Sequence, residues 1–600
     1  MMADHGWNRS SSSKLNFKIR YKPFLGFAFS MRYRRPKYLT CTSLFIFLLL
    51  FSLSPAVQGR ASHDIPWDES ENAKTADLIK KRISEAGSPP KIRIGKEFIH
   101  DTVMLDRFYS RRGFRPAWAG ANGSLAQAYA LVKAIEDSRN EGLTPDYYHL
   151  KNIESLLAGI REGAAKDGPS FETMADLDLL LTDAFLLLSC HLSAGCVNPV
   201  TLDAEWHAGR ETVDVSSILE KALEDDLIEE TLIKLLPSQY GYSRLRQALA
   251  HDRKIAERGG WPAVSTGPSL KKESFDRRVI ELKKRLIASG DLTPEEDESG
   301  ELFDETLEQA VIRFQEQHGL DADGVAGPAT LKAINVPVQA RIRQIELNME
   351  RLRWIPRDLG QKYIIVNIAD FKLDLFENGH TNMSMKVVVG KNYWHTPVFS
   401  AVMTYLELNP YWNVPKNIMV REIIPKMSKD PDYLAKNNLK VIWEGQGRIE
   451  VIDPEALDWS LASAKNFNYK LRQDPGPQNP LGRIKFMFPN RFNVYLHDTP
   501  VKNLFSKNVR AFSHGCIRIE KPMELAEYLL KRDPSWTQER IQAAIDDGRN
   551  KAVRLPQPIA VYILYLTAWV DEAGRLNFRE DVYDRDIQMD KALGKRPPAP

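Results

Sequence analysis

The apolar residues between positions 100 and 270 recur at helical spacing. One run forms a continuous stripe with steps of three or four positions, made of Leu177, Leu180, Leu181, Ala184 and Leu188. A second run, Leu227–Leu249, is interrupted at Pro237, which predicts more than one helix. We expect residues 62–275 to form a helical scaffold domain.

The histidines and cysteines of this segment do not form a recognisable site in the sequence. His149, His191 and His207 are isolated, so we expect each to be a hydrogen-bonded structural residue rather than a ligand. Cys190 and Cys196 lie six positions apart. Two alternatives remain open for them, a disulfide that contributes about 2 kcal/mol by closing a short loop or two buried thiols.

Residues 302–336 have the pattern of two short helices. Leu307, Ala310, Val311 and Phe314 share one helical face. Gly319 is a typical helix-ending residue, and Pro328 is suited to the first turn of a second helix. We expect a small helical domain over residues 276–340, with nothing catalytic in it.

From about residue 363 the apolar positions alternate instead. Ile364, Val366 and Ile368 are followed by Phe371, Leu373 and Leu375, which predicts a β-hairpin. We expect a mostly β domain over residues 341–553. A polar, helix-prone insertion should interrupt it at about 426–475, and a C-terminal segment, 554–600, contains a further strand at Ala560–Leu566. The fold class is therefore multidomain α+β.

Composition excludes several classes of protein. With 600 residues, the chain is long enough for roughly three to five domains. Four cysteines are too few for a disulfide scaffold or a multi-cysteine metal framework. The net charge is +3, but residues 1–59 alone hold nine lysines and arginines against one aspartate. The remainder is mildly acidic, which argues against a nucleic-acid partner.

The basic N-terminal region has the order of an export signal. Residues 32–37 are basic, residues 38–59 carry no charge, and small residues surround Gly59. Residues 1–61 are therefore expected to be a signal peptide or an uncleaved membrane anchor, and a start at Met31 would give a signal of ordinary length. Either alternative places the body of the protein in the periplasm.

The candidate chemistry lies in Ser513-His514-Gly515-Cys516-Ile517-Arg518, with His497 nineteen residues before the cysteine. An imidazole can take the proton of a thiol and stabilise the thiolate. Glycine lets the backbone approach a substrate, so the N–H groups of Gly515 and Cys516 are expected to be oxyanion donors. A metal site of His497, His514 and Cys516 is the weaker alternative, because its spacing is unusual and no acidic cluster accompanies it.

This motif resembles the signature of the L,D-transpeptidase (YkuD-type) catalytic domain, and Thr396-Pro397 and Gly476–Gly482 support it. The segment Ala310–Gln315 with His318-Gly319-Leu320 is similar to a peptidoglycan-binding domain. The order of the domains resembles the large periplasmic, YcbB-like branch of the family, which has an N-terminal scaffold and a capping insertion in the catalytic domain.

The resemblance implies a function and a role for each residue of the motif. Cys516 is expected to be the nucleophile and His497 its general base, while Ser513, His514 and Gly515 shape the oxyanion and substrate site. Arg518 either steadies the site electrostatically, meets a peptide carboxylate, or forms a salt bridge within the fold.

The implied reaction joins peptidoglycan stem peptides by 3→3 cross-links through a thioester, with a tetrapeptide donor and an amine acceptor. It needs no cofactor and no metal, and carbapenem-type inhibitors are expected to acylate Cys516. Cell-wall synthesis proteins are possible partners. The alternatives are an L,D-carboxypeptidase, attachment of a wall lipoprotein, and a non-catalytic peptidoglycan-binding protein.

Overall fold

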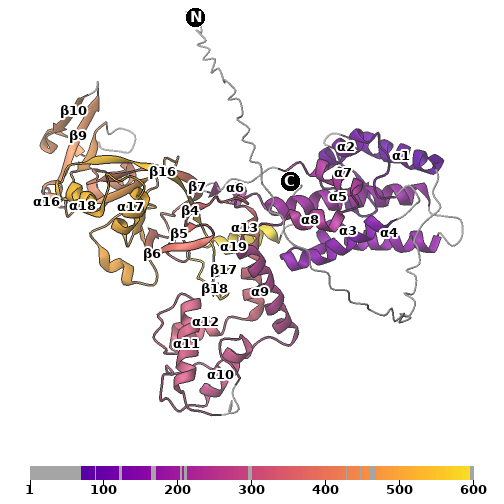
Figure 1. Ribbon diagram of the computed structural model, residues 1–600, viewed down its shortest axis with the longest axis horizontal. Coiled ribbons are helices and arrows are strands. Elements are labelled where there is room, and N and C mark those ends of the chain that lie inside the picture. The colour runs from indigo at the N-terminus through magenta and orange to yellow at the C-terminus, as the bar shows by residue number, and fades with distance from the viewer. Residues whose placement is uncertain are drawn as a thin grey trace, which may run out of the picture. The chain divides into compact units, whose positions relative to one another are not determined.

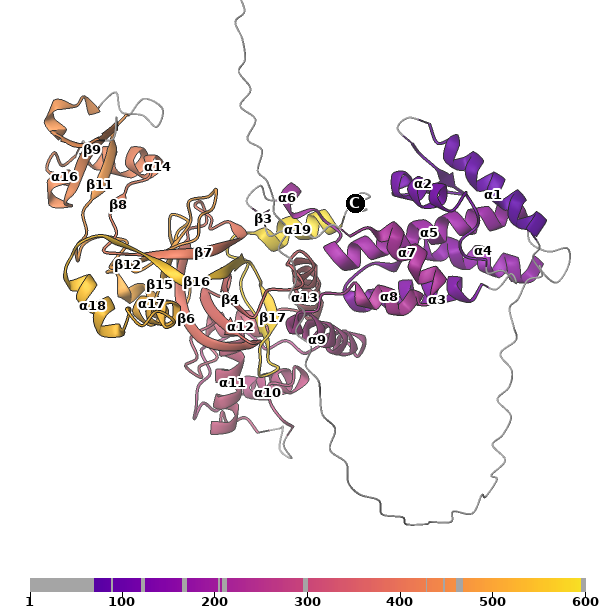
Figure 2. The same ribbon diagram turned by 45° about the horizontal axis from the view of Figure 1, so that its top comes forward.

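The computed structural model describes ten segments of the chain, shown in Figures 1 and 2. They are residues 69–87, 90–119, 125–163, 170–202, 206–207, 213–294, 300–427, 429–445, 448–459 and 468–594. The expected export segment, residues 1–61, lies outside the described residues.

The N-terminal part is a group of helices around one buried helix, α5 (Phe171–Ala194). Around it lie α1 (Glu69–Ser84), α2 (Thr102–Arg111), α3 (Ala126–Asp137), α4 (Leu150–Gly163) and α7 (Val215–Glu224). Among the described residues, α5 alone is long and apolar enough to cross a membrane, but its apolar window is entirely buried in the protein. It is therefore the core helix of this part of the chain.

The second apolar run forms two helices, as its proline predicted. α8 (Ile228–Lys234) ends before Pro237, and α9 (Tyr240–Glu257) follows it. The open question about the cysteines is also answered, because Cys190 and Cys196 are both buried thiols and form no disulfide.

The region between 262 and 336 has a core of its own. It consists of α10 (Arg278–Ala288), α11 (Glu305–Gln317) and α12 (Pro328–Ile334), with Pro328 in the first turn as predicted. Asp304 caps α11 by accepting the N–H of Leu307. The helix α13 (Val338–Arg353) then packs against α9.

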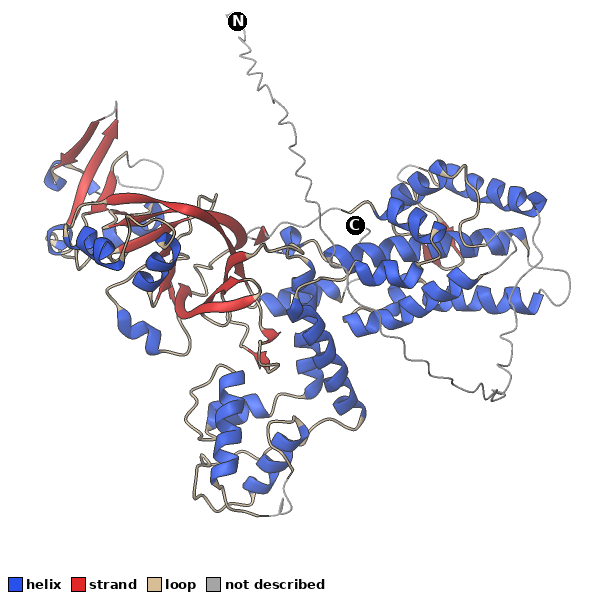
Figure 3. Ribbon diagram, viewed as in Figure 1, coloured by secondary structure: helices blue, strands red, loops and turns tan. Residues whose placement is uncertain are grey.

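The third part is built on one large sheet, seen in red in Figure 3. Its strands are β4 (Lys362–Asn367), β5 (Lys372–Glu377), β6 (His380–Gly390), β7 (Val398–Leu408), β12 (Ile484–Met487), β13 (Leu496–His497), β14 (Ala511–Ser513), β15 (Ile517–Ile519) and β16 (Lys551–Leu564), joined by β3 (Trp206–His207) from the helical part. β4 and β5 form the predicted antiparallel hairpin. Because β12 pairs with both β13 and β7, the sheet closes on itself.

The sheet extends beyond the boundary expected at residue 553. β16 lies between β4 and β7, parallel to one and antiparallel to the other, so residues 551–564 form a central strand. The chain continues through β17 (Ala568–Val570), β18 (Leu576–Phe578) and α19 (Arg585–Leu593), which packs against α13.

The insertion begins earlier than the expected residue 426, since its first strand pairs at residues 412–413, and its expected helix-prone character is wrong for most of its described residues. Its short helices, α14 (Lys416–Ile418), α15 (Ile424–Met427) and α16 (Tyr433–Lys436), are confined to its first part. After them, the described residues form β9 (Leu439–Gly445), β10 (Arg448–Ile452), a short 3-10 turn at Pro454–Ala456 and β11 (Lys470–Gln473). These three strands complete a four-stranded sheet with β8 (Trp412–Asn413). Charged and apolar residues alternate along β9 and β11, so the segment is polar in composition although one face is buried.

Candidate active site

Cys516 lies in the turn between β14 and β15, two strands of the large sheet. β14 runs parallel to β6 and β15 runs antiparallel to it, so both ends of the turn are fixed by the same strand. The buried hydroxyl of Ser513 donates to the carbonyl of Cys516 (2.5 Å) and accepts the N–H of Gly515 (3.1 Å). Gly515 has φ +109°, a conformation that other residues rarely adopt. The thiol is thereby left half-buried at the end of a rigid turn.

His497 reaches the same place from the neighbouring strand. β13 pairs in parallel with β15, with Leu496 opposite Ile517 and His497 opposite Arg518. Cys516 is therefore level with Tyr495, whose ring lies 5.7 Å from that of His497. The hydroxyl of Tyr495 also hydrogen-bonds to the thiol. The nineteen residues between His497 and Cys516 thus separate two groups that the sheet places on adjacent strands.

Burial favours the neutral form of the His497 imidazole. The Nδ1 of His497 donates to the carbonyl of Asp498 (2.5 Å), which leaves Nε2 as the basic nitrogen. Burial, followed by the positive charge of Arg518, lowers the pKa of His497 to about 3. The imidazole is therefore neutral throughout the physiological range of pH.

The thiol is also neutral in this state. Burial raises the pKa of Cys516, while hydrogen bonds from Tyr495 and the charges of Lys485 and Arg518 partly oppose that effect. The Nε of Arg518 is buried and has no hydrogen-bond partner among the described residues. Those residues also give Arg518 no salt bridge, so its charge acts on Cys516 and His497.

The insertion contacts the nucleophile turn through His514. Nε2 of His514 is hydrogen-bonded to Glu422, in the π-helical segment Met419–Ile423, and the two rings of His514 and Trp394 lie 5.6 Å apart. Arg421 of the insertion lies over the ring of Trp394. The side chain of His514 is thus turned towards the insertion.

One expected role is corrected by these contacts. The N–H of Gly515 is donated to the hydroxyl of Ser513, so it is engaged within the turn. The Ser513 hydroxyl accepts this N–H and also donates to the carbonyl of Cys516, and these two bonds close the turn. The N–H of Cys516 takes no part in these two hydrogen bonds.

Two buried residues, Thr396 and Tyr583, support the turn through hydrogen bonds, and the sequence did not identify either as a site residue. Thr396 Oγ1 donates to the carbonyl of Gly515 (2.9 Å) and accepts the N–H of Gly390 (3.0 Å). The hydroxyl of Tyr583 donates to the carbonyl of Gly390 (2.5 Å). Tyr583 lies 187 residues after Thr396, and no local pattern in the sequence marks it.

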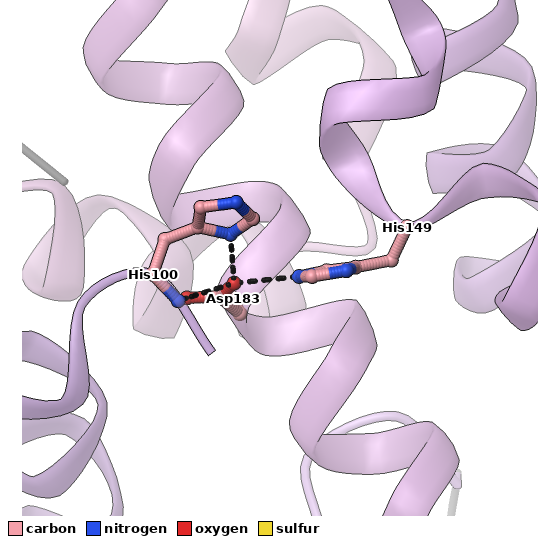
Figure 4. A group of neighbouring side chains, drawn as sticks. All are labelled: His100, His149 and Asp183. Atoms are coloured by element: carbon pink, nitrogen blue, oxygen red, sulfur yellow. Dashed lines mark hydrogen bonds and ion pairs between the residues drawn. The ribbon is translucent and has the colours of Figure 1, made fainter. Parts of the chain in front are cut away.

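His149 is a hydrogen-bonded structural residue, as expected, but it belongs to a cluster that the sequence did not reveal. Figure 4 shows His100 and His149 on either side of Asp183, whose Oδ2 lies 2.8 Å from Nδ1 of His100 and 2.7 Å from Nε2 of His149. Nδ1 of His149 also meets Glu97. The residues come from three separate segments, which is why sequence spacing did not reveal the cluster. His191 is likewise a structural residue, hydrogen-bonded to Tyr148 (3.0 Å), as expected.

The cluster has the character of a buried ion pair. Burial lowers the pKa of His149, but its hydrogen bonds to Asp183 and Glu97 outweigh this effect and raise the pKa overall. The potential metal-ligating atoms of His100, His149 and Asp183 lie within 4.8 Å of one another. However, both histidine nitrogens face the Asp183 oxygen at hydrogen-bond distance, so proton sharing accounts for the arrangement.

Three family matches divide the chain in the order of its structural parts. Residues 104–249 match a scaffold domain, residues 276–334 match the family described as "Putative peptidoglycan binding domain", and residues 361–536 match the L,D-transpeptidase catalytic domain. Residues 361–536, which hold Cys516, His497 and most of the closed sheet, therefore match an L,D-transpeptidase catalytic domain, in one chain with segments that match a scaffold domain and a peptidoglycan-binding domain.

Curated relatives match parts of the chain. The chain is 34% identical over 250 residues to a protein of Haemophilus influenzae named "Putative L,D-transpeptidase", covering 42% of this chain and 49% of that one. It is 44% identical over 70 residues to the N-acetylmuramoyl-L-alanine amidase CwlL of Bacillus licheniformis, covering 12% of this chain and 19% of the relative. The chain thus spans about half the length, or less, of these curated relatives.

Solved structures add little to this assignment. An L,D-transpeptidase from Stackebrandtia nassauensis aligns over 50% of this chain and 96% of its own, at 12% identity and a TM-score of 0.20. A TM-score of this size supports no argument about the fold.

Proposed function

We propose that this protein is a cysteine-dependent L,D-transpeptidase that forms 3→3 cross-links between peptidoglycan stem peptides. The observation that carries the proposal is the pairing of β13 with β15 within the L,D-transpeptidase domain, which sets His497 beside the turn that presents Cys516. A half-buried thiol next to a buried, neutral imidazole is the arrangement that acyl transfer through a thioester requires.

The first step forms the acyl-enzyme. The Sγ of Cys516 attacks the carbonyl carbon of the third residue of a tetrapeptide stem, and its proton passes to Nε2 of His497. The tetrahedral intermediate then collapses, the C–N bond to D-Ala breaks, and His497 returns the proton to the leaving amine. The product is a thioester at Cys516 and free D-Ala.

The second step transfers the acyl group. The side-chain amine of a second stem peptide attacks the thioester, a new amide bond forms, and the thiol is regenerated. The reaction consumes no nucleotide because the thioester conserves the energy of the broken amide. This suits a compartment outside the cytoplasmic membrane, where the basic and apolar N-terminal segment would send the protein.

The low pKa of His497 has a consequence for the mechanism. The resting pair is a neutral thiol and a neutral imidazole, so the proton moves only as the sulfur attacks. The charges of Lys485 and Arg518 stabilise the negative sulfur that develops at that moment. The hydrogen bond from Nδ1 to the carbonyl of Asp498 orients the ring, and Nε2 would be the nitrogen that takes the thiol proton.

The developing oxyanion needs a donor other than Gly515. We assign that role to the N–H of Cys516, because the N–H of Gly515 is held by Ser513. The insertion, which reaches His514 through Glu422, would limit the access of water to the thioester and so favour the amine over hydrolysis.

The test is intact-protein mass spectrometry of the full chain with a disaccharide-tetrapeptide. We expect an adduct on Cys516 with loss of D-Ala, followed by a 3→3 dimer. Release of tripeptide without dimer would replace the proposal by an L,D-carboxypeptidase. A protein that forms no adduct with the peptide or with a carbapenem would be a non-catalytic wall-binding protein instead.

A further inference from the structure

A cavity of about 580 Å³ lies against one face of the large sheet. β4 and β5 form its floor, and its other walls come from the start of α9, the C-terminal end of α13 and β17. The volume is in the range of sites that hold small molecules. The lining contains neither Cys516 nor His497, and none of residues 276–334, so the cavity is separate from the candidate active site and from the peptidoglycan-binding-like domain.

The charged side chains of the lining already have partners within the described part of the chain. Three carboxylates form ion pairs at 2.7, 3.1 and 2.9 Å, namely Asp370 with Arg579, Asp374 with Lys372, and Asp571 with Arg575. The fourth, Glu572, accepts two hydrogen bonds from Thr381. Both arginines of the lining donate to backbone carbonyls, Arg244 to that of Asp571 and Arg357 to those of Lys234 and Leu235. The lining therefore gives no preference to a charged ligand.

The uncharged polar groups of the lining, in contrast, still have hydrogen-bonding capacity. The hydroxyl of Tyr363 and the side-chain amides of Gln361 and Asn378 make no hydrogen bond to the described residues. The amide nitrogen of Gln239 donates to the carbonyl of Pro356 (2.7 Å), but its Oε1 is buried and has no partner among the described residues. A buried acceptor without a partner is costly, so a ligand that donates a hydrogen bond here would be favoured.

Aromatic rings lie beside these polar groups. Tyr363 and Phe376 are opposite each other on β4 and β5, with their rings stacked at 5.0 Å, and Trp569 lines another wall from β17. All three side chains are only partly buried. Sugar rings have C–H faces that pack on aromatic rings and hydroxyl or amide groups that hydrogen-bond at their edges. The lining therefore has the two features that an uncharged sugar requires.

We propose that this cavity binds an uncharged oligosaccharide, the glycan part of peptidoglycan. A wholly apolar ligand would leave Oε1 of Gln239 without a partner, and the carboxylates of a stem peptide would find no free cation. The assignment to peptidoglycan rests on the proposed function, while the preference for a neutral sugar rests on the lining. A glycan strand bound here would keep the protein on the wall between successive reactions at Cys516.

The test is calorimetric titration of the full chain with chitotetraose, an uncharged tetramer of N-acetylglucosamine. Tyr363→Phe removes one hydroxyl of the lining and keeps the ring, and Gln361→Ala removes an exposed amide of the lining. Tyr562→Phe and Gln588→Ala are the matched controls, because they make the same chemical changes at residues that do not line the cavity. Hydrogen exchange of the complex then locates the bound sugar along the chain.

We expect Tyr363→Phe and Gln361→Ala each to weaken binding about fivefold, as for the loss of one hydrogen bond, while the controls change it less than about twofold. Added salt should leave the affinity unchanged because the ligand carries no charge. Hydrogen exchange should slow in residues 361–381 and 564–572. The proposal is overturned if the parent protein does not bind, if test and control variants bind equally, if a free tetrapeptide competes, or if protection is confined to residues 276–334.

Acylation of the parent protein by a carbapenem is measured separately. If Cys516 is not acylated but the cavity variants still lose chitotetraose binding, the proposed activity fails and the sugar site stands. If acylation proceeds and the cavity variants bind like their controls, the sugar site fails alone.

Discussion

The contact between Thr396 and the nucleophile turn gives the sharpest test of how this fold supports acylation. Replacing Thr396 by valine keeps the shape of the side chain and removes its hydroxyl. The N–H of Gly390 and the carbonyl of Gly515 each lose a partner that lies 2.9–3.0 Å away in a fully buried site. Each orphaned buried group costs about 1–3 kcal/mol, so we expect the catalytic domain to lose about 2–4 kcal/mol of stability.

The same change should release the turn that carries Cys516. A misplacement of about 1 Å can cost about 100-fold in rate, so we expect acylation by a carbapenem to slow by about 10- to 100-fold. The assay is the rate of adduct formation followed by intact-protein mass spectrometry, together with denaturant unfolding of the same samples.

Two further variants separate positioning from stability. Thr396→Ser retains the hydroxyl and should acylate within about threefold of the parent. Thr330→Val removes a buried hydroxyl that donates to Val325 and contacts Gln315 in the peptidoglycan-binding-like domain, so it should lose stability without slowing acylation. The reasoning fails if Thr396→Val acylates as fast as Thr330→Val.

Three other predictions follow from the charges and hydrogen bonds of the protein. Cys516→Ala should abolish covalent adducts and leave thermal unfolding unchanged, and any residual adduct on this variant would contradict the assigned nucleophile. The rate of acylation should stay level from about pH 5 to 8, without an inflection near 6.5, because the reactive pair of neutral thiol and neutral imidazole persists between the pKa of His497, about 3, and the raised pKa of Cys516; a limb near 6.5 would refute the neutral-imidazole mechanism. His149→Asn should lower the melting temperature most at acidic pH. The pKa of His149 is raised in the folded protein, so the stabilisation is complete below the pKa of the unfolded chain and is lost as pH rises through the pKa of the folded protein. A difference in melting temperature that stays constant from pH 5 to 9 would show that His149 is not an imidazolium in the folded protein.

The sequence by itself determined the elements whose signals are local. The helical spacing around Leu181 gave α5, the alternation from Ile364 gave the β4–β5 hairpin, and Pro328 marked the first turn of α12. The six residues from Ser513 to Arg518 were enough to indicate an L,D-transpeptidase domain, because serine, histidine, glycine and cysteine in that order form a short and specific motif. In each of these cases the relevant neighbours lie within a few positions of one another.

Only the tertiary structure decided the contacts between distant segments. The pairing of β13 with β15, the support of the turn by Thr396 and Tyr583, and the engagement of the Gly515 N–H depend on strands brought together by the closed sheet. The strands of the insertion were missed because exposed charged residues are interspersed with buried residues along them, which makes the composition of the segment polar. The His149 cluster was missed for the same physical reason, since its partners come from three segments that meet only when the helices pack around α5.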